Sequence, residues 1–157
     1  MSTSETVLAP EATITDITGR TDLVSNGELL RTVFGNLVDA LPVVVSFEGN
    51  PAIAPARVWF GRPWQNTSEV AASLPDSANN YFSLAVFRPD EAGKVRRQKA
   101  RFQALYAVML DDIGSKVALE RLTLRPSWLL ESSPDNYQAG YLLDEPLTDG
   151  GVADRLM

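Results

Sequence analysis

The sequence predicts a single α+β domain, with a mainly antiparallel sheet and with helices packed on one face of it. An amphipathic helix follows Ser25, and several short β-branched or aromatic segments have the composition of strands. Near the C-terminus, two of these segments flank Ser132–Asn136, a run of turn-forming residues that predicts a β-hairpin. With 157 residues, 45% of them apolar, the chain is long enough to bury a core of its own.

The individual elements follow from local patterns. Residues 1–20 are rich in Ser, Thr and acids and are predicted to form a mobile tail, followed by one domain over residues 21–157. Ser25 and Glu28 have the spacing of a capping box, and the apolar stripe of the helix that follows runs to Leu41, just before a proline. Strands are predicted over residues 43–47, 57–60, 81–87, 106–110, 127–131 and 137–143. Further helices are predicted over residues 69–74, 95–104 and 117–122, and a last one is capped by Thr148 or Asp149.

The two ends of the chain carry different information. The N-terminus has neither the basic nor the apolar region of a signal peptide, and the longest apolar run, Leu41–Val45, is too short to span a membrane. We therefore expect a cytoplasmic protein that does not enter a membrane. At the other end, the last predicted helix begins shortly before Met157, so either it is a frayed terminal helix or the domain is truncated.

Two residue types are absent, and their absence excludes several kinds of site. The chain has no cysteine, which excludes disulfides, thiolate metal sites and Cys nucleophiles. It has no histidine, which excludes a Ser–His–Asp triad and imidazole metal ligands. The glycine motifs that cradle phosphates are absent as well. Chemistry here depends on carboxylates, hydroxyls, Lys or Arg, with hard cations as the natural metals.

Charge is unevenly distributed along the chain. The net charge is −6, which on average repels nucleic acid and anionic lipid. Residues 88–101, however, hold six cations and only two acids, a local charge of +4. We interpret this segment either as a solvated helix face or as a nucleic-acid-binding surface. In the second case, the residues expected to hold template phosphates are Lys94, Arg96, Arg97, Lys99 and Arg101.

Asp111 and Asp112 are the strongest candidates for chemistry. They follow a buried-type strand, and two carboxylates at a strand end can hold Mg²⁺ or Mn²⁺ through oxygen. Successive residues of a regular strand point to opposite faces, so both serve one metal only if the strand bends at Asp112. The following Ile113-Gly114 is compatible with such a bend. The alternative interpretation is a turn acid and a helix cap.

Polar residues of the predicted hairpin form the second candidate site. Gln138 can donate and accept hydrogen bonds to a phosphate, a sugar or a base, although it cannot act as a general base. Asn136 and Ser133 lie in the same stretch and can contribute further hydrogen bonds. The alternatives are a solvated polar strand residue at Gln138 and a turn-stabilising role for the serine. We interpret Trp59, Trp64 and Trp128 as packing residues rather than base-stacking platforms.

The order of these segments resembles a known family. The stretches YFSLAVF (residues 81–87), VMLDDIG (108–114) and PSWLLESSPDNYQAGYLL (126–143), with the basic segment between the first two, are similar to RepB-type replication primases of plasmids and phages. These proteins belong to the archaeo-eukaryotic primase superfamily, and the resemblance covers roughly residues 79–157. It implies an RRM-like palm in which Asp111 and Asp112 bind Mg²⁺ or Mn²⁺ and Ser133–Gln138 contact a nucleotide.

The sequence departs from the family pattern in three places. The acids are adjacent rather than spaced as Asp-x-Asp, with Met109 two positions before Asp111. Gln138 stands where the family usually carries a histidine. A third acidic motif at a strand end has no counterpart before Met157. The leading hypothesis is therefore a primase/polymerase-like domain for metal-dependent nucleotidyl transfer on single-stranded DNA, incomplete or catalytically degenerate. The alternatives are a non-catalytic phage or mobile-element module that binds a host protein, and single-strand binding without chemistry.

Overall fold

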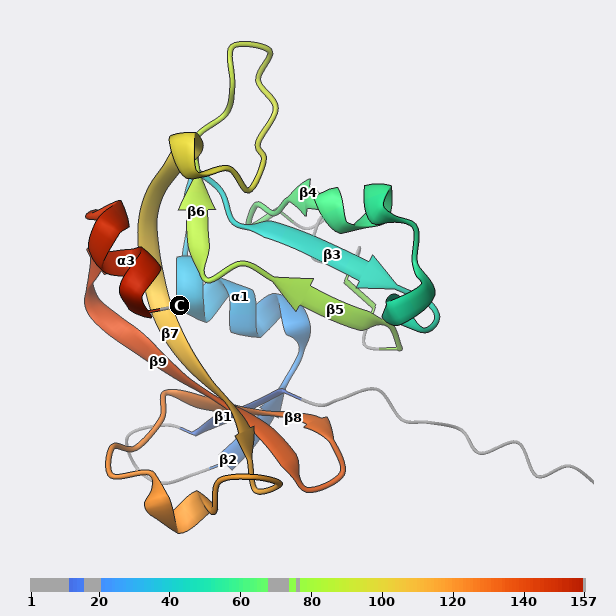
Figure 1. Cartoon of the computed structure of the whole chain (residues 1–157), viewed down its shortest axis with the longest axis vertical. Helices are drawn as coiled ribbons and strands as arrows, with labels where there is room; N and C mark the ends of the chain where they lie inside the picture. Colours follow the sequence, from blue (N-terminus) through green and yellow to red (C-terminus); the bar gives the residue numbers. More distant parts are fainter. Residues whose placement is uncertain (1–11, 16–20, 68–73, 76, 157) are drawn as a thin grey trace, which may run out of the picture.

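The computed structural model of the protein describes residues 12–15, 21–67, 74–75 and 77–156, and within them the strands form two antiparallel sheets (Figure 1). The main sheet contains, in spatial order, β2 (Thr21–Val24), β1 (Ala12–Thr15), β8 (Trp128–Ser133), β9 (Asn136–Leu147), β7 (Phe102–Ile113) and β6 (Ala85–Phe87). The small sheet contains β4 (Arg62–Pro63), β3 (Val43–Phe47) and β5 (Asn79–Phe82). The α+β class and the mainly antiparallel sheet are confirmed, and so is the hairpin, which is formed by β8 and β9.

The strand predicted over residues 81–87 is divided between the two sheets. Phe82 pairs with Val44 in the small sheet, whereas Ala85 pairs with Leu105 in the main sheet. The chain passes from the small sheet to the main sheet at Ser83. Ser83 Oγ accepts a hydrogen bond from the backbone N–H of Val43 (2.9 Å) and donates one to the carbonyl of Ala85 (2.7 Å). Its side chain therefore satisfies backbone groups that the interrupted strand leaves without a ladder partner.

The first helix, α1 (Asn26–Phe34), begins as predicted and ends earlier. The Ser25–Glu28 capping box is present in both directions. The helix stops at Gly35, whose φ of +59° lies in the left-handed region that glycine tolerates. The apolar residues beyond it leave the helical stripe, and Val38 is 76% exposed. Leu41 instead forms an isolated β-bridge with Phe87, so a contact distant in sequence replaces the last helical turns.

Helices α1 and α3 contact opposite faces of the main sheet, so the described helices do not share the single face that was expected. Residues of α1 share a buried cluster with Val86 of β6. The C-terminal helix α3 (Gly150–Leu156) places Ala153 in a second cluster with Ala85 and Phe87. Neighbouring residues of a strand point to opposite faces, so the sheet lies between the two helices. The carboxylate of Asp149, one of the two predicted caps, accepts hydrogen bonds at the start of α3.

Several short segments differ from their predicted structure. Residues 57–60 are not a strand: they belong to the 3₁₀ helix η2 (Ala56–Phe60), which follows η1 (Pro51–Ile53). Residues 117–122 contain only a 3₁₀ turn, η4 (Leu119–Arg121). Ala12–Thr15, expected within a mobile tail, form β1 between β2 and β8. The helix predicted over residues 69–74 falls almost wholly on residues outside those described.

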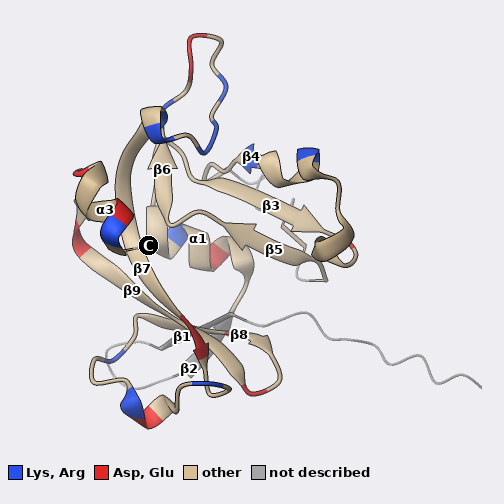
Figure 2. Cartoon of the chain, in the orientation of Figure 1, with Lys and Arg blue, Asp and Glu red and all other residues tan. Residues whose placement is uncertain are grey.

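The basic segment, residues 88–101, is a loop rather than a helix, and we call it the basic loop (Figure 2). Asp90 Oδ1 accepts hydrogen bonds from the backbone N–H groups of Ala92 (2.9 Å) and Lys94 (2.8 Å), and Pro89 forms a β-bridge with Val95. A single 3₁₀ turn, η3 (Lys99–Arg101), precedes β7. The Asp90 side chain thus stabilises a turn that ends at Lys94, before the helix predicted over residues 95–104. That helix is absent, and from Phe102 onward its residues belong to β7, which pairs with β6. In the described part of the chain, no helix is long and apolar enough to cross a membrane.

Acid is expected to weaken the start of α1 through Glu28. Hydrogen bonds from the backbone and side chain of Ser25 hold the pKa of Glu28 below its ordinary value of 4.5. A carboxyl with a lower pKa in the folded state contributes stability above its ordinary pKa and loses it as the pH falls. In urea unfolding between about pH 6 and about pH 2, Glu28→Gln should lose less stability than the wild type. Glu48→Gln, at an exposed acid just after β3, is the control. Identical acid profiles for all three proteins would contradict the prediction.

Candidate functional site

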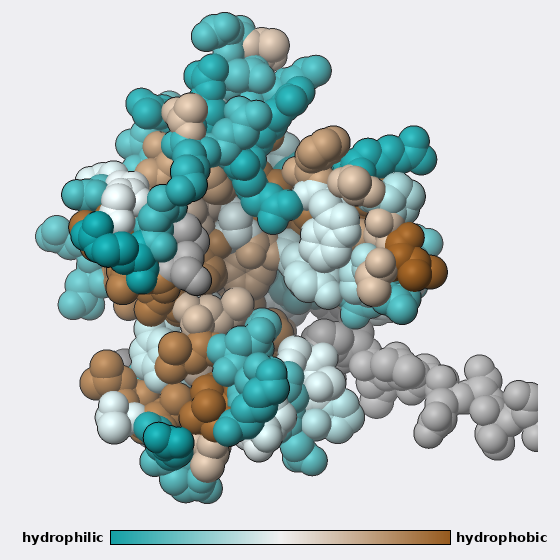
Figure 3. Space-filling model, in the orientation of Figure 1, coloured by the Kyte–Doolittle hydropathy of each residue, from teal (hydrophilic) through white to brown (hydrophobic). Residues whose placement is uncertain are grey.

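A cleft lies between the small sheet and the main sheet and consists of two adjoining hollows. The larger has a volume of about 630 Å³ and an apolar lining from the β5–β6 connection, β7 and α3. Its principal apolar residues are Phe82, Leu84, Phe87, Phe102 and Met109. Charged residues of the basic loop and of α3, namely Arg97, Lys99 and Asp154, also line it. Figure 3 shows the recessed apolar surface between the basic loop and the lower strands.

The smaller hollow, of about 140 Å³, is richer in polar side chains. Three carboxamide and two hydroxyl side chains line it: Asn79, Asn80 and Tyr81 of β5, Gln138 of β9 and Ser132 of β8. Phe82 and Met109 line both hollows, so the two adjoin. We call the pair of hollows the intersheet cleft. Its volume lies in the range of small-molecule sites, about 300–1,000 Å³.

Gln138 is one of the polar residues of the cleft that remain available to a ligand; Gln98, in the larger hollow, is another. Asn80 is fully engaged: its amide donates to the carbonyls of Pro75 and Ala78, and its oxygen accepts from Ser46. Gln138 is half-buried, and its amide has no hydrogen-bond partner among the described residues. Among the described residues, the buried side-chain polar atoms without a partner are Trp64 Nε1 and Trp128 Nε1, so the amide of Gln138 is open to water, and a bound ligand would replace those water contacts.

Asp111 and Asp112 lie opposite Gln138 in a β-bulge. The β7–β9 pairing runs to Leu110 and Ala139 and resumes at Ile113 and Tyr137, so two residues of β7 face one residue of β9. Asp112 has a φ of +59°, and its backbone N–H donates to Asp111 Oδ1 (2.8 Å). The strand therefore bends at the position that a shared metal site requires. Neither aspartate lines the intersheet cleft.

Lys116 forms an ion pair with one of the two aspartates. Its Nζ lies 2.6 Å from Asp112 Oδ2 in an exposed ion pair. The hydrogen bond to Asp112, the charge of Asp112 and the charge of Asp111 together raise the pKa of Lys116 above its ordinary value of 10.5. Among the described residues, no group of three or more His, Cys, Asp or Glu side chains comes together. Two carboxylates still fit Mg²⁺, which is commonly held by one or two carboxylates together with substrate phosphates.

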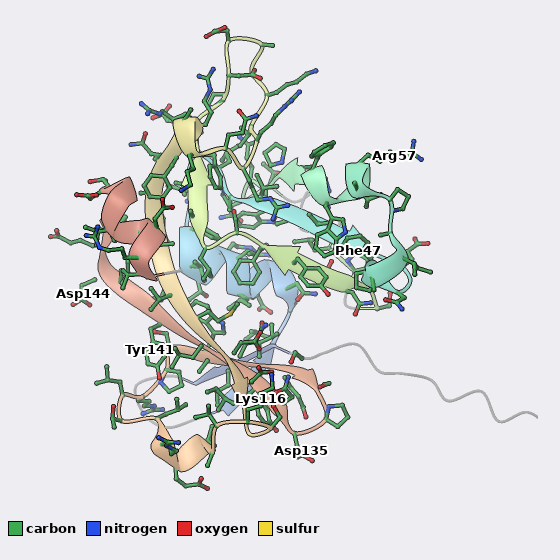
Figure 4. All side chains as sticks on the ribbon, in the orientation of Figure 1. Phe47, Arg57, Lys116, Asp135, Tyr141 and Asp144 are labelled. Atoms are coloured by element: carbon green, nitrogen blue, oxygen red, sulfur yellow. The ribbon has the colours of Figure 1, made fainter. Side chains whose placement is uncertain are left out.

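The two stretches that carry the strongest family resemblance meet in space. Ser115 Oγ donates to Asn136 Oδ1, and Asn136 Nδ2 donates to Ser132 Oγ (2.9 Å). A Cβ at Gly114 would lie 2.4 Å from the carbonyl oxygen of Asp135, so the turn after β7 packs tightly on the hairpin turn. Figure 4 shows Lys116 and Asp135 at this end of the molecule.

The other two polar residues predicted in the hairpin have different positions from Gln138. Asn136 connects the two turns through its side chain, and its predicted contact with a nucleotide would have to compete with that role. Ser133 is exposed and pairs with Asn136 at the hairpin end, outside both hollows of the intersheet cleft. Of the three, the structure places only Gln138 in the cleft.

The predicted phosphate-binding cations are dispersed over the basic loop and its base. Arg97 Nη2 donates to the carbonyl oxygen of Trp59, and Lys99 Nζ lies 2.5 Å from Asp154 Oδ2. Arg101 lies 3.7 Å from Glu91. The side chains of Lys94 and Arg96 are exposed and have neither an ion-pair nor a hydrogen-bond partner among the described residues. Of these five cations, Arg97 and Lys99 line the intersheet cleft, and none of the five belongs to an α-helix face.

Sequence reasoning missed the contribution of β5 to the site. Asn79 and Asn80 form a polar pair just before the predicted strand, and this pair is the only sequence feature that could have identified them. Nothing in the local sequence indicates that they approach Gln138. Trp64 and Trp128 are 1% exposed, which confirms their packing role. No family model, curated protein or solved structure matches this chain.

Proposed function

We propose that this protein is a primase-like domain of a phage or mobile-element replication system. In this proposal it acts in the cytoplasm, binds a nucleotide and single-stranded DNA, and supports metal-dependent nucleotidyl transfer. The observation that carries the proposal is the amide of Gln138, which has no hydrogen-bond partner among the described residues and lines the intersheet cleft beside the bulge of Asp111 and Asp112. The resemblance to RepB-type primases rests on the same two stretches of sequence.

The cleft has the chemistry that a nucleotide needs. Gln138 can donate and accept hydrogen bonds to a base, a sugar or a phosphate, and the apolar lining beside it excludes water from a flat ring. Arg97 and Lys99 at the other end supply positive charge for phosphate groups. A nucleotide is therefore a better match for the cleft than a purely apolar ligand.

Asp111 and Asp112 would hold the divalent cation. Their oxygens are ligands that Mg²⁺ and Mn²⁺ prefer, and both residues lie in the bulge at the same end of β7. When bound, the ion neutralises charge on the reacting phosphate. Lys116 keeps Asp112 paired in the free protein and has to release that carboxylate when an ion binds.

Nucleotide binding tests the proposal directly. We expect the wild type to bind a ribonucleoside triphosphate in the presence of Mn²⁺ in isothermal calorimetry. Gln138→Ala should weaken that binding by about tenfold, because one hydrogen bond to a ligand contributes about 1–1.5 kcal/mol. Gln103→Ala, at an exposed glutamine of β7 outside the cleft, is the matched control. Absence of binding by the wild type, or equal affinity of both variants, would overturn the proposal.

The Asp112–Lys116 ion pair favours a second candidate, a non-catalytic module that binds a host protein. In such a module the carboxylate of Asp112 would be neutralised by Lys116 and would need no metal ion. The proposed function predicts the opposite for Lys116→Met: loss of the competing ammonium should tighten Mn²⁺ binding about two- to fivefold, the strength of an exposed ion pair. Electron paramagnetic resonance of free Mn²⁺ measures this, with Lys94→Met as the control. If neither the wild type nor Lys116→Met binds Mn²⁺, the module is the better description.

A further inference from the structure

Three aromatic rings form a cluster on the outer side of the small sheet. Phe47 of β3, Trp59 of η2 and Tyr81 of β5 have ring centroids separated by 4.6 Å (Phe47–Trp59), 5.3 Å (Trp59–Tyr81) and 5.7 Å (Phe47–Tyr81). The 3₁₀ turns between β3 and β4 bring Trp59 over the sheet. They fit closely there, because a Cβ at Gly61 would lie 2.5 Å from the carbonyl oxygen of Val44.

Part of this aromatic surface is open to solvent. Tyr81 is 43% exposed, Trp59 is half-buried, and Phe60, which follows Trp59 in the chain, is 73% exposed. We call Phe47, Trp59, Phe60 and Tyr81 the aromatic platform. Phe47 is 6% exposed, so the aromatic area open to solvent comes from Trp59 and Phe60 of η2 and Tyr81 of β5. Exposed aromatic residues gathered in one patch are unusual for a surface that contacts only water.

Cations border the aromatic platform although the chain as a whole is acidic. Arg97 of the basic loop donates a hydrogen bond to the carbonyl oxygen of Trp59, which ties the loop to the platform. Arg57 lies on the same 3₁₀ helix as Trp59 and is exposed, and Figure 4 shows Arg57 and Phe47 on the same part of the molecule. The exposed Lys94 and Arg96 extend the positive charge along the loop (Figure 2). Aromatic rings beside cations are the combination that binds single-stranded nucleic acid.

We infer that the aromatic platform stacks the bases of single-stranded nucleic acid, with the phosphates lying along the basic loop. Tyr81 connects this surface to the proposed site, because it also lines the smaller hollow that contains Gln138. The inference rests on the proposed function in naming the platform as the path of the template. Stacking tolerates every base, so it supplies affinity for a strand without reading its sequence.

Quenching of tryptophan fluorescence by an external ligand reports mainly on Trp59 of the platform. The chain has three tryptophans, and Trp64 and Trp128 are 1% exposed, so an external quencher reaches Trp59 first. We expect an oligothymidylate of about 15 nucleotides to quench the emission of the wild type as it binds. Trp59→Phe should keep the affinity, measured by anisotropy of a labelled oligonucleotide, and lose most of the quenching. Binding of the oligonucleotide without quenching in the wild type would overturn the inference.

Substitutions on the platform test whether the contact is stacking. Phe60→Ala and Tyr81→Ala should each weaken oligothymidylate binding by about five- to 100-fold. Phe60→Tyr should retain the affinity, whereas Phe60→Leu should not, because leucine keeps apolar area without a π face. Leu124→Ala, at a residue that is 71% exposed elsewhere on the surface, is the control. For an abasic oligonucleotide of equal length, the wild type and Phe60→Ala should bind alike.

The outcomes separate this inference from the proposed function. Rescue by Phe60→Leu, or equal loss for the abasic strand, would overturn base stacking and indicate a docking surface for an apolar peptide. If the platform variants bind the oligonucleotide normally while Gln138→Ala loses nucleotide binding, only this inference fails. If stacking is observed while the wild type binds no nucleotide, only the proposed nucleotide site fails.

Discussion

Asparagine in place of Asp111 is expected to lower nucleotidyl transfer by about 100-fold or more. Residues that only support a metal ligand commonly cost about 10–100-fold when changed, so loss of a ligand charge should cost at least as much. The substitution keeps the side chain's size, and its amide oxygen can still accept the hydrogen bond from the backbone N–H of Asp112. The change therefore removes charge from the bulge while the local backbone contact survives.

De novo primer synthesis on single-stranded DNA, with Mn²⁺ and ribonucleotides, measures this effect. Asp144→Asn is the matched control, because Asp144 is an exposed acid on β9 outside the cleft. Oligothymidylate binding should be equal in both variants, which shows that each is folded. Activity of Asp111→Asn at the wild-type level would contradict the metal role of Asp111. A wild type without activity would contradict the catalytic part of the proposal.

Alanine in place of Gly140 is expected to destabilise the fold by about 3 kcal/mol or more. Gly140 of β9 lies directly against the ring of Trp128 on β8, and a Cβ there would be 2.0 Å from Trp128 Cε2 and 2.1 Å from Cζ2. Trp128 is 1% exposed and packs in the core with residues of α1. The ring has no free space to move into, so the extra methyl group has to displace the core or separate the hairpin strands.

Urea unfolding followed by tryptophan fluorescence measures the loss. Gly49→Ala is the matched control, because a Cβ at Gly49 meets nothing within 4 Å and its backbone has no left-handed φ. We expect the control to lie within about 0.5 kcal/mol of the wild type. An unchanged unfolding midpoint for Gly140→Ala would show that Trp128 can reorient, contrary to the close packing described above.

Part of the candidate site could be predicted from sequence because its two halves are short local motifs. Asp111 and Asp112 follow an apolar strand, and Gln138 lies in the second strand of a hairpin marked by its turn residues. The bulge that places them opposite each other depends on the pairing of β7 with β9, which no local pattern specifies. The asparagines of β5 were not predicted for the same reason, whereas the ion pair of Asp112 with Lys116 joins residues only four positions apart.

For the basic segment, the positive charge was predicted from the sequence, but the predicted helix is wrong. Its cations lie on a loop, in which Asp90 caps a turn and the backbone of Pro89 pairs with Val95. Helix propensity over so short a stretch is a weak preference that tertiary strand pairing can override. Phe102 then continues into β7, because β6 and β9 supply backbone partners on both sides.

What the sequence by itself determined are the features whose partners lie within a few residues. The Ser25–Glu28 capping box, the β-branched strand at Val43–Phe47 and the hairpin of β8 and β9 all depend on such local interactions. The tertiary structure alone decided the change of sheet at Ser83 and the intersheet cleft. These features depend on hydrogen bonds and packing between segments distant in the chain, so they exist only after both sheets have formed.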